Sequence, residues 1–508
     1  MQSLSFVLGG LSLLAVLIQI FFNSQAGVPV LALFTNTVCS STPLASNSPH
    51  SPGWSTWFHP ERLGSTLSPW RFQERSILHH LGGNGPWIQK VTPGSPENSP
   101  PKHCSVEQVH LLSRHSERYP TQTAGQRHLE LVDRLKELDV PLNGSLAFVN
   151  NWTYFTQDPQ QDFDQLTSTG PYAGTLASFT TGTRFRTRYG HLLPQNRKTR
   201  IWASDSQRVI DTARYFAAGV FGIDWGKDGK AEVQIIPETL DQHTDTLTPG
   251  DTCVQFIEDT VLGHDYGKNM LAAFQNAYIP RITERLLYEE ENTALESFSN
   301  LEVYSMQEMC GFETIVRGSS PWCEAFTSKD WDHFEYARDI LHYYRAGPGN
   351  KYAAVMGWLW LHATGQLLKA GPKNGTMFFS FVHDGDIAPV LTALDLFHDS
   401  KYDPNLPVTH IAKDRKWRVS TVLPMGGRLT FERLQCTSNS LEEAFVRINI
   451  NDGVVPLPDC DSGPGKSCPL DKFIKRIHER KVQIGEFVDV CGTSGVDTGI
   501  TFLTQPDN

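Results

Sequence analysis

The pattern of apolar and polar residues predicts an α/β chain in which polar clusters follow short buried strands. Three runs predict strands, at residues 109–112, 199–204 and 377–382. The last run is apolar except for one serine, as expected of a parallel strand buried on both faces. Charged residues follow each run closely, and a segment with helical spacing comes next. Because open α/β sheets place their ligands at the carboxyl ends of strands, these junctions are candidate sites.

Helical spacing accounts for most of the remaining pattern. Helices are predicted over 124–138, 171–193 and 209–218. The stretch 221–373 is mostly helical, with its better segments at 257–262, 271–288, 331–344 and 353–368. We interpret this stretch as a helical domain inserted into the sheet. The predicted organisation is an α/β part at 104–220, the helical domain at 221–373 and a second α/β part at 374–508.

The first residues have the pattern of a targeting segment rather than of a fold. Residues 6–22 are nearly all apolar, and Ser24-Gln25-Ala26 offers the small residues that a signal peptidase prefers. We therefore predict a signal peptide at 1–26 and no stable membrane insertion after its cleavage. The alternative is an uncleaved membrane anchor, although a run this short is at the lower limit for crossing a bilayer.

The segment after the signal peptide is predicted to be a leader rich in Pro, Ser and Gly, spanning 27–103, and partly docked. No helical or strand period persists in it. The tract from His80 to Trp87 combines a glycine-rich turn with a large aromatic residue. This combination predicts a loop docked on the folded body, with a structureless linker as the alternative.

Charge and cysteine content narrow the class of protein. The 508-residue chain has a formal net charge of -11 and no block of Lys and Arg, which argues against a nucleic-acid partner. Its nine cysteines include no CxxC pair and fit a secreted disulfide framework better than a metal site. Sequons make Asn143, Asn151 and Asn374 predicted glycosylation sites. These features predict a secreted protein, extracellular or in a cell wall.

A basic cluster follows the first predicted strand. In the stretch RHSERYP, Arg114 and Arg118 flank His115. Two guanidinium groups could hold phosphate oxygens while an imidazole nitrogen attacks phosphorus. Taken alone, the cluster could equally be the solvated basic start of a helix. The junctions after the other two strands supply Arg208 and the stretch HDGD at 383–386.

Other catalytic motifs are incomplete. Residues 463–467 look like the end of a Walker loop, but Cys460 stands where the first glycine is required. Residues 492–495 are one residue short of a nucleophile elbow, and His478-Glu479 lacks the second histidine of a zinc-protease motif. A nucleotide-binding loop, a serine hydrolase and a zinc protease are therefore not supported.

The two polar motifs together resemble the signature of the histidine acid phosphatases. RHSERYP is similar to the RHGxRxP motif of that family, and HDGD is similar to its HD motif. The resemblance covers about Phe72 to Cys491 and is greatest to the fungal and yeast secreted acid phosphatases and phytases. Flanking matches are HLGGNGPW, DSQRV, SPWCEAFT, YYRAGPG and INDGVVPLPDC. It implies a phosphoglycerate-mutase-like α/β domain, a mainly helical second domain and an active site between them.

The resemblance also implies a role for each site residue. His115 matches the nucleophile that becomes phosphohistidine, and Asp384 matches the proton donor. The residues expected to bind the substrate phosphate are Arg114, Arg118, Arg208 and His383. Their positive charge can stabilise the phosphoryl oxygens without a metal, so no metal and no cofactor is expected.

Four disulfides are implied by the resemblance, whereas spacing alone leaves the connectivity open. The implied pairs are Cys104 with Cys436, Cys253 with Cys491, Cys310 with Cys323, and Cys460 with Cys468. Cys39 lies in the leader and has no assigned partner.

Ser116 departs from the motif, where the family has glycine. If glycine is needed for an unusual dihedral angle or close approach to phosphate, serine would strain the loop. This leaves open a non-catalytic secreted protein that binds phosphate esters. A phosphoglycerate-mutase-like transferase is a second alternative, against which secretion and disulfides argue.

The function expected from the sequence is a secreted acid phosphatase that hydrolyses small-molecule phosphomonoesters through phosphohistidine. The preferred ester, including whether the enzyme is a phytate-preferring 3-phytase, is left open, and so is the oligomeric state. The site arginines stay charged in acid and keep His115 neutral, while the general acid must be protonated. We therefore expect optimal hydrolysis between about pH 2.5 and 5.5.

Overall fold

The computed structural model describes residues 76–89, 99–438, 441–493 and 498–505. The predicted signal peptide, Cys39 and most of the leader lie outside these ranges. Within them, no helix has both the length and the apolar character needed to cross a membrane.

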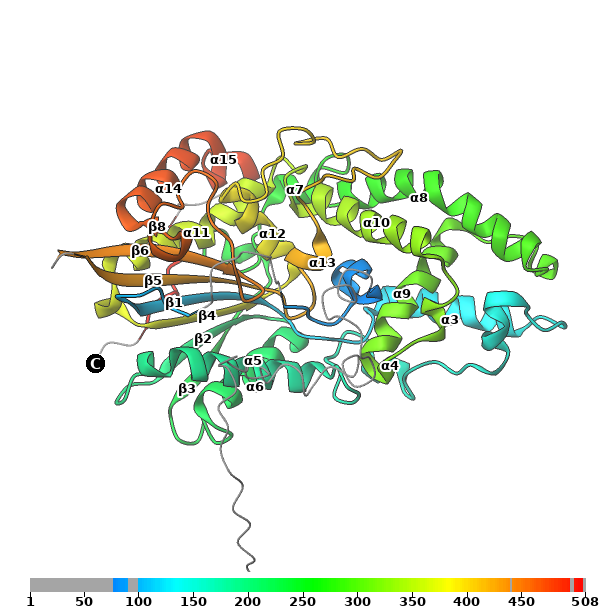
Figure 1. Cartoon of the computed structure of the whole chain (residues 1–508), viewed down its shortest axis with the longest axis horizontal. Helices are drawn as coiled ribbons and strands as arrows, with labels where there is room; N and C mark the ends of the chain where they lie inside the picture. Colours follow the sequence, from blue (N-terminus) through cyan, green and yellow to red (C-terminus); the bar gives the residue numbers. More distant parts are fainter. Residues whose placement is uncertain (1–75, 90–98, 439–440, 494–497, 506–508) are drawn as a thin grey trace, which may run out of the picture. The chain divides into compact units, whose positions relative to one another are not determined.

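A single mixed sheet forms the centre of the fold (Figure 1). Its strand order is β3-β2-β4-β1-β5-β6-β7, with β8 paired to β6. The strands are β1 (Cys104–Arg114), β2 (Thr199–Ser204), β3 (Ala231–Ile236), β4 (Met377–Val382), β5 (Arg428–Ser438), β6 (Leu441–Ile450), β7 (Gly453–Val454) and β8 (Cys468–Pro469). Strands β3, β2, β4 and β1 are parallel, and the strands from β5 onward are antiparallel. The three predicted strands are confirmed as the neighbours β2, β4 and β1.

The α-helices of the described residues lie on both faces of the sheet and in a separate helical region. They are α3 (Gln122–Lys136), α4 (Pro159–Asp162), α5 (Gly174–Tyr189), α6 (Gln207–Phe221), α7 (Val254–Glu258), α8 (Tyr266–Glu284), α9 (Asn300–Arg317), α10 (Ser328–Ala346), α11 (Ala353–Ala370), α12 (Asp384–Ala393), α13 (Val419–Val422), α14 (Leu470–Ile484) and α15 (Phe487–Cys491).

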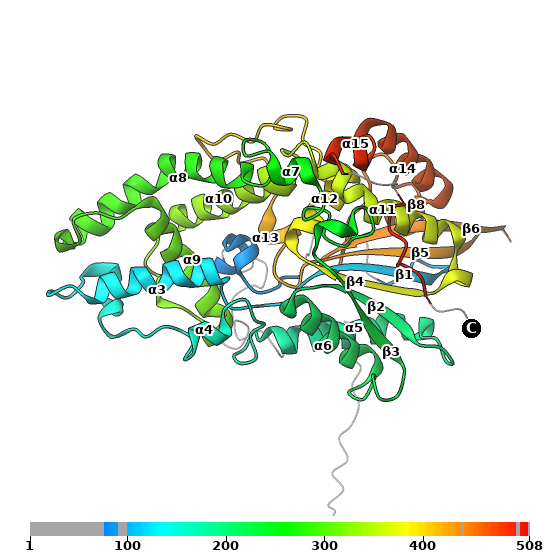
Figure 2. The same ribbon diagram turned by 180° about the vertical axis from the view of Figure 1, so that it is seen from behind.

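Helices α5 and α6 cover one face of the sheet, and α11, α12 and α14 cover the other (Figures 1 and 2). On the first face Phe216 of α6 meets Phe379 and Phe381 of β4 edge to face, at 5.0 and 5.1 Å between ring centroids. Helices α5 and α6 approach closely because Gly219 lacks a side chain: a Cβ there would lie 2.2 Å from the carbonyl oxygen of Phe179. Burial of β4 on both faces explains why its residues are apolar except for Ser380.

The helical region packs α8 against α10 and α3 against α9, beyond the carboxyl ends of the parallel strands (Figure 1). The predicted helical character of 221–373 was wrong at one point, because β3 lies within it and extends the parallel sheet. This edge strand has exposed positions in its middle and therefore shows no apolar run. The helix predicted at 257–262 is also displaced: α7 ends at Glu258, and the Asp259 carboxylate accepts from the backbone N–H groups of Val261 and Leu262.

Four disulfides fasten the described residues. They join Cys104 to Cys436, Cys253 to Cys491, Cys310 to Cys323, and Cys460 to Cys468, which are the pairs implied by the resemblance. The first ties the start of β1 to β5. The third staples α9 to the turn that follows it.

Candidate active site

The carboxyl ends of three adjacent parallel strands bring the candidate residues together. Arg114 ends β1 and pairs in register with Val382, the last residue of β4. The residues that follow these two positions, His115 and His383, lie with ring centroids 5.7 Å apart. Arg208 lies in the first turn of α6, after β2. All six predicted site residues line one cavity of about 450 Å³: Arg114, His115, Arg118, Arg208, His383 and Asp384.

His115 is held so that one ring nitrogen is free to act as a base or nucleophile. Its Nδ1–H donates to the carbonyl oxygen of Ser116 at 2.8 Å, which leaves the lone pair on Nε2. The backbone is fixed on both sides, because the His115 N–H donates to Val382 and its carbonyl accepts from Gly426. Burial lowers the pKa of His115 well below its usual range, and the charges of Arg114, Arg208 and Arg118 lower it further. The imidazole is therefore neutral even in acid.

The three candidate arginines carry donor groups that the protein does not fill. Arg114 donates from Nη1 to the carbonyls of Gly83 and Leu423, at 2.9 and 2.8 Å. Arg118 donates from Nη1 to the carbonyl of Tyr119, and burial beside the other arginines lowers its pKa to about 9. In the described residues, a buried Nε without a hydrogen-bond partner occurs in these two and in Arg208, and also in Arg127 and Arg338 of the same cavity and in Arg188 outside it. Buried unpaired donors on cationic groups favour an anionic ligand.

Asp384 forms an ion pair with the first of these arginines. Its Oδ2 lies 2.9 Å from Arg114 Nη2, and its Oδ1 lies 3.7 Å from Arg345 Nη1. Burial alone would raise the pKa of Asp384, but the charges of Arg114, His342 and Arg345 outweigh burial and hold the pKa well below its usual range. Without a ligand, Asp384 is therefore a carboxylate.

His383 lies between a cation and an anion. Arg208 Nη2 is 3.4 Å from its Nδ1, and its Nε2 is 2.9 Å from Glu238 Oε1. A ring that accepts from Arg208 carries its proton on Nε2 and donates it to Glu238. Glu238 was missed by the sequence analysis because it follows β3, the strand that the apolar pattern did not reveal.

Ser116 fits its position without strain. It is not among the residues with positive φ, so its backbone is ordinary. Its N–H donates to Thr212 Oγ1 at 3.0 Å, and its hydroxyl accepts from Ser178 Oγ at 2.8 Å. The side chain faces a second, smaller cavity behind the loop, lined also by Trp87 and Gly426, and not the cavity that holds His115.

Further charged residues line the outer part of the cavity, and the sequence analysis did not assign them. Arg127 is 2.8 Å and Arg338 is 3.8 Å from Glu308, which partly neutralises both. Within the described residues Arg345 forms an ion pair only with Asp384, and 37% of its side chain is accessible. None follows a predicted strand, although Arg345 lies in the tract YYRAGPG, which was recognised as a flanking match.

Comparison with known proteins agrees with this fold and shows the family. The model of the histidine phosphatase superfamily, branch 2, matches residues 105–451, so the chain belongs to that superfamily. Members of this family hydrolyse phosphomonoesters through a phosphohistidine intermediate. A phytase of Candida albicans is 33% identical over 426 residues, covering 83% of this chain and 88% of its own. An acid phosphatase of Komagataella pastoris is 34% identical over 426 residues, covering 82% and 86%. The crystal structure of the phytase from D. castellii has a TM-score of 0.78 at 29% identity, covering 87% of this chain and 94% of that one.

Proposed function

We propose that this chain is a secreted acid phosphatase in which His115 is the nucleophile and Asp384 the proton donor. The observation that carries the proposal is the free Nε2 of a neutral, buried His115 in a cavity lined by five arginines whose Nε groups have no hydrogen-bond partner. The four disulfides support an oxidising compartment and hence secretion.

In the first step the phosphate of the ester binds Arg114, Arg118 and Arg208. His115 Nε2 then attacks phosphorus, a P–N bond forms and the bond from phosphorus to the ester oxygen breaks. Asp384 gives its proton to the departing oxygen, which leaves as an alcohol. His115 becomes a phosphohistidine.

The proton on Asp384 depends on the substrate. The ion pair with Arg114 keeps the side chain ionised in the free enzyme. A bound phosphate competes for Arg114 and places negative charge beside the carboxylate, and both effects raise the pKa of Asp384. Substrate binding thus favours the protonated form of Asp384, which is the form that can donate a proton.

In the second step water attacks phosphorus and the P–N bond breaks. The Asp384 carboxylate accepts a proton from that water, and inorganic phosphate is released with His115 restored. His383, placed by Arg208 and Glu238, is a further phosphate contact in this proposal.

The outer arginines support substrates that carry more than one phosphate, and phytate is such an ester. Arg345 in particular is accessible and borders the same cavity. We therefore include phytate among the proposed substrates. An Arg345→Ala variant is expected to lose more kcat/KM on phytate than on an aryl phosphate, whereas equal losses would contradict a role for Arg345 in binding a second phosphate.

Trapping the phosphoenzyme tests the central proposal. Wild-type protein mixed briefly with a radiolabelled phosphomonoester in acid is expected to retain label that is lost on further incubation as inorganic phosphate. His115→Ala is expected to retain none and to have no turnover. Label that passes to a second sugar phosphate would indicate the transferase, and wild-type protein that never acquires label would indicate the non-catalytic alternative.

A further inference from the structure

A short N-terminal segment, residues 76–89, supports the loop that carries the nucleophile. The carbonyl of Gly83 accepts from Arg114 Nη1 at 2.9 Å, and the N–H of Trp87 donates to Glu117 Oε1 at 2.8 Å. Asn84 lines the catalytic cavity itself. The segment belongs to the predicted leader. It nevertheless contacts Arg114 and Glu117, the first and fourth residues of the RHSERYP loop.

The fit between this segment and Arg114 leaves no free space. A Cβ on Gly83 would lie 2.9 Å from Arg114 Nη1 and 3.4 Å from the Leu423 carbonyl oxygen. Leu81, between the two short 3₁₀ turns of the segment, is 0% exposed. A shift of the segment backbone therefore has to move the Arg114 guanidinium.

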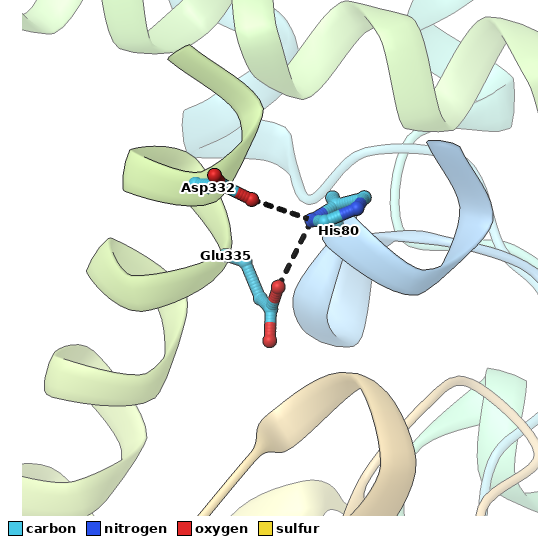
Figure 3. Close-up of side chains that lie close together, drawn as sticks. All are labelled: His80, Asp332 and Glu335. Atoms are coloured by element: carbon cyan, nitrogen blue, oxygen red, sulfur yellow. Dashed lines mark ion pairs between the residues drawn. The ribbon is translucent and has the colours of Figure 1, made fainter. Parts of the chain in front are cut away.

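One ionic cluster joins the segment to α10 (Figure 3). His80 Nδ1 lies 2.9 Å from Glu335 Oε2 and 3.7 Å from Asp332 Oδ1. The two acidic residues are one helical turn apart on the same side of α10. The other carboxylate oxygen of Glu335 accepts from Arg415 and Arg418, at 3.0 and 2.9 Å.

A histidine with two carboxylates is also a set of ligands that a divalent metal could bind, since the three ligand atoms lie within 4.8 Å of one another. The surroundings do not favour a divalent cation. Two guanidinium groups already neutralise Glu335. Asp332 is 59% exposed and can turn to water, so little net negative charge is held in place for a divalent cation.

We propose that His80, Asp332 and Glu335 form a clasp that fastens the N-terminal segment to α10 and thereby positions Arg114. His80 is a positioning residue in this inference, because it contacts neither substrate nor reacting atoms. The inference rests on the proposed function in that Arg114 is taken to hold the substrate phosphate.

The charged groups around His80 determine how strongly it is attracted to Glu335. The titratable and charged groups around it are His79 on its own turn, Asp332, Glu335 and Asp339 on α10, and Arg415 and Arg418 on the loop before α13. Burial opposes ionisation of Glu335, but His80, Arg415 and Arg418 outweigh burial and lower its pKa. A carboxyl with a lowered pKa adds stability above its unfolded pKa and loses it only as the pH falls through the lower folded value.

The chain offers a matched control for testing the clasp. His398 also lies near two carboxylates, 3.6 Å from Asp395 and 3.3 Å from Asp403, but it contacts neither the segment nor the cavity. In acid, His80→Ala is expected to speed hydrogen–deuterium exchange in peptides covering 76–89, to weaken inhibition by inorganic phosphate and to lower kcat/KM on an aryl phosphate. His398→Ala is expected to change none of these.

Two further variants separate positioning from general stability. His80→Lys supplies a cation that can pair with the same carboxylates, so it is expected to restore the segment's slow exchange and the kcat/KM lost in His80→Ala. Gly83→Ala is expected to lower kcat/KM on the order of 10- to 100-fold, because a small displacement of a phosphate clamp is costly. Because the added Cβ crowds a buried side chain, its melting temperature is expected to fall as well, so weaker inhibition by inorganic phosphate is the readout that identifies displacement of Arg114.

The inference is overturned if His80→Ala and His398→Ala give the same exchange in 76–89 and the same kcat/KM. It is also overturned if Zn²⁺ raises the melting temperature of the wild type but not of His80→Ala, because the cluster would then be a metal site. Wild-type protein without turnover or phosphoenzyme would refute the proposed function alone. The exchange experiment would still report on the clasp.

Discussion

His115 and Asp384 act on different atoms of the ester, so their removal has different consequences. Asp384→Asn keeps the shape of the side chain but cannot donate a proton, which is expected to slow turnover roughly 10²- to 10⁴-fold. The loss should be larger for an alkyl phosphate than for an aryl phosphate, because an aryl oxide leaves without a proton more readily. Steady-state kinetics on the two esters checks this, and equal losses would show that Asp384 is not the proton donor.

Ser116 is expected to be a tolerated variation of the motif. Ser116→Gly removes the hydrogen bond from Ser178 and leaves an ordinary backbone, so it should cost about 0.5–1.5 kcal/mol in the free energy of unfolding. Its kcat/KM should stay close to the wild-type value. A gain of an order of magnitude would instead reveal strain at this position. Urea unfolding and kinetics on one preparation give both quantities.

At the scale of elements, the sequence predicted best where burial is complete. Strand β4 is apolar at nearly every position because both of its faces are covered, and its bounds were predicted correctly. Strand β3 lies at the edge and exposes Gln234 and Ile235, so its pattern is indistinguishable from that of a loop. The same difference limited the prediction of site residues. Residues that follow a recognised strand were predicted, whereas Glu238, which follows β3, was not.

Residues of the helical region that reach the cavity could not be predicted from local pattern. Arg338 lies among buried residues of α10, and only the fold shows that this part of the helix borders the site. Motif residues such as His115 were found because a strand and a resemblance both indicated them. The segment 76–89 was expected to dock or to be a linker, but no local feature predicted its contact with Arg114.

The close packing of α5 on α6 predicts a sharp contrast between two glycines. Gly219→Val places a side chain against the Phe179 carbonyl and is expected to destabilise the protein by about 1–3 kcal/mol or more. Gly190 has a helical φ of -59° and nothing within 4 Å of a Cβ, so Gly190→Ala should be neutral or stabilising. Calorimetric melting of both variants tests whether this layer is as tight as described.

For the whole molecule, resistance to acid should depend on buried carboxylates. Burial opposes ionisation of Glu308, but His128, Arg127 and Arg338 outweigh burial and lower its pKa to about 2. Because the folded pKa is depressed, its contribution is fully present above about pH 4.5 and is lost as the pH falls through about 2. That contribution is on the order of 3 kcal/mol. Glu308→Gln is expected to flatten the fall in melting temperature between these pH values, and an unchanged slope would contradict it.

The pH dependence of activity follows from the same charges at the site. His115 is neutral throughout the acid range because its pKa is lowered, and Asp384 can hold a proton only in acid with phosphate bound. The kcat/KM profile of the purified protein on a small phosphomonoester should therefore peak between about pH 2.5 and 5.5. A maximum at neutral or alkaline pH would contradict the acid-phosphatase assignment.

The disulfide between Cys104 and Cys436 has a consequence for biosynthesis, since its partners are separated by 332 residues. At roughly 5–20 residues per second, the ribosome needs on the order of 20–70 s to make the intervening chain. During that time Cys104 is an unpaired thiol while Cys253, Cys310 and Cys323 emerge. Cys310 and Cys323 can pair with each other at once, but Cys253 has to wait for Cys491. A temporary disulfide between Cys104 and Cys253 is the expected non-native pairing. Its rearrangement by a disulfide isomerase would then be the slow step in maturation of the protein.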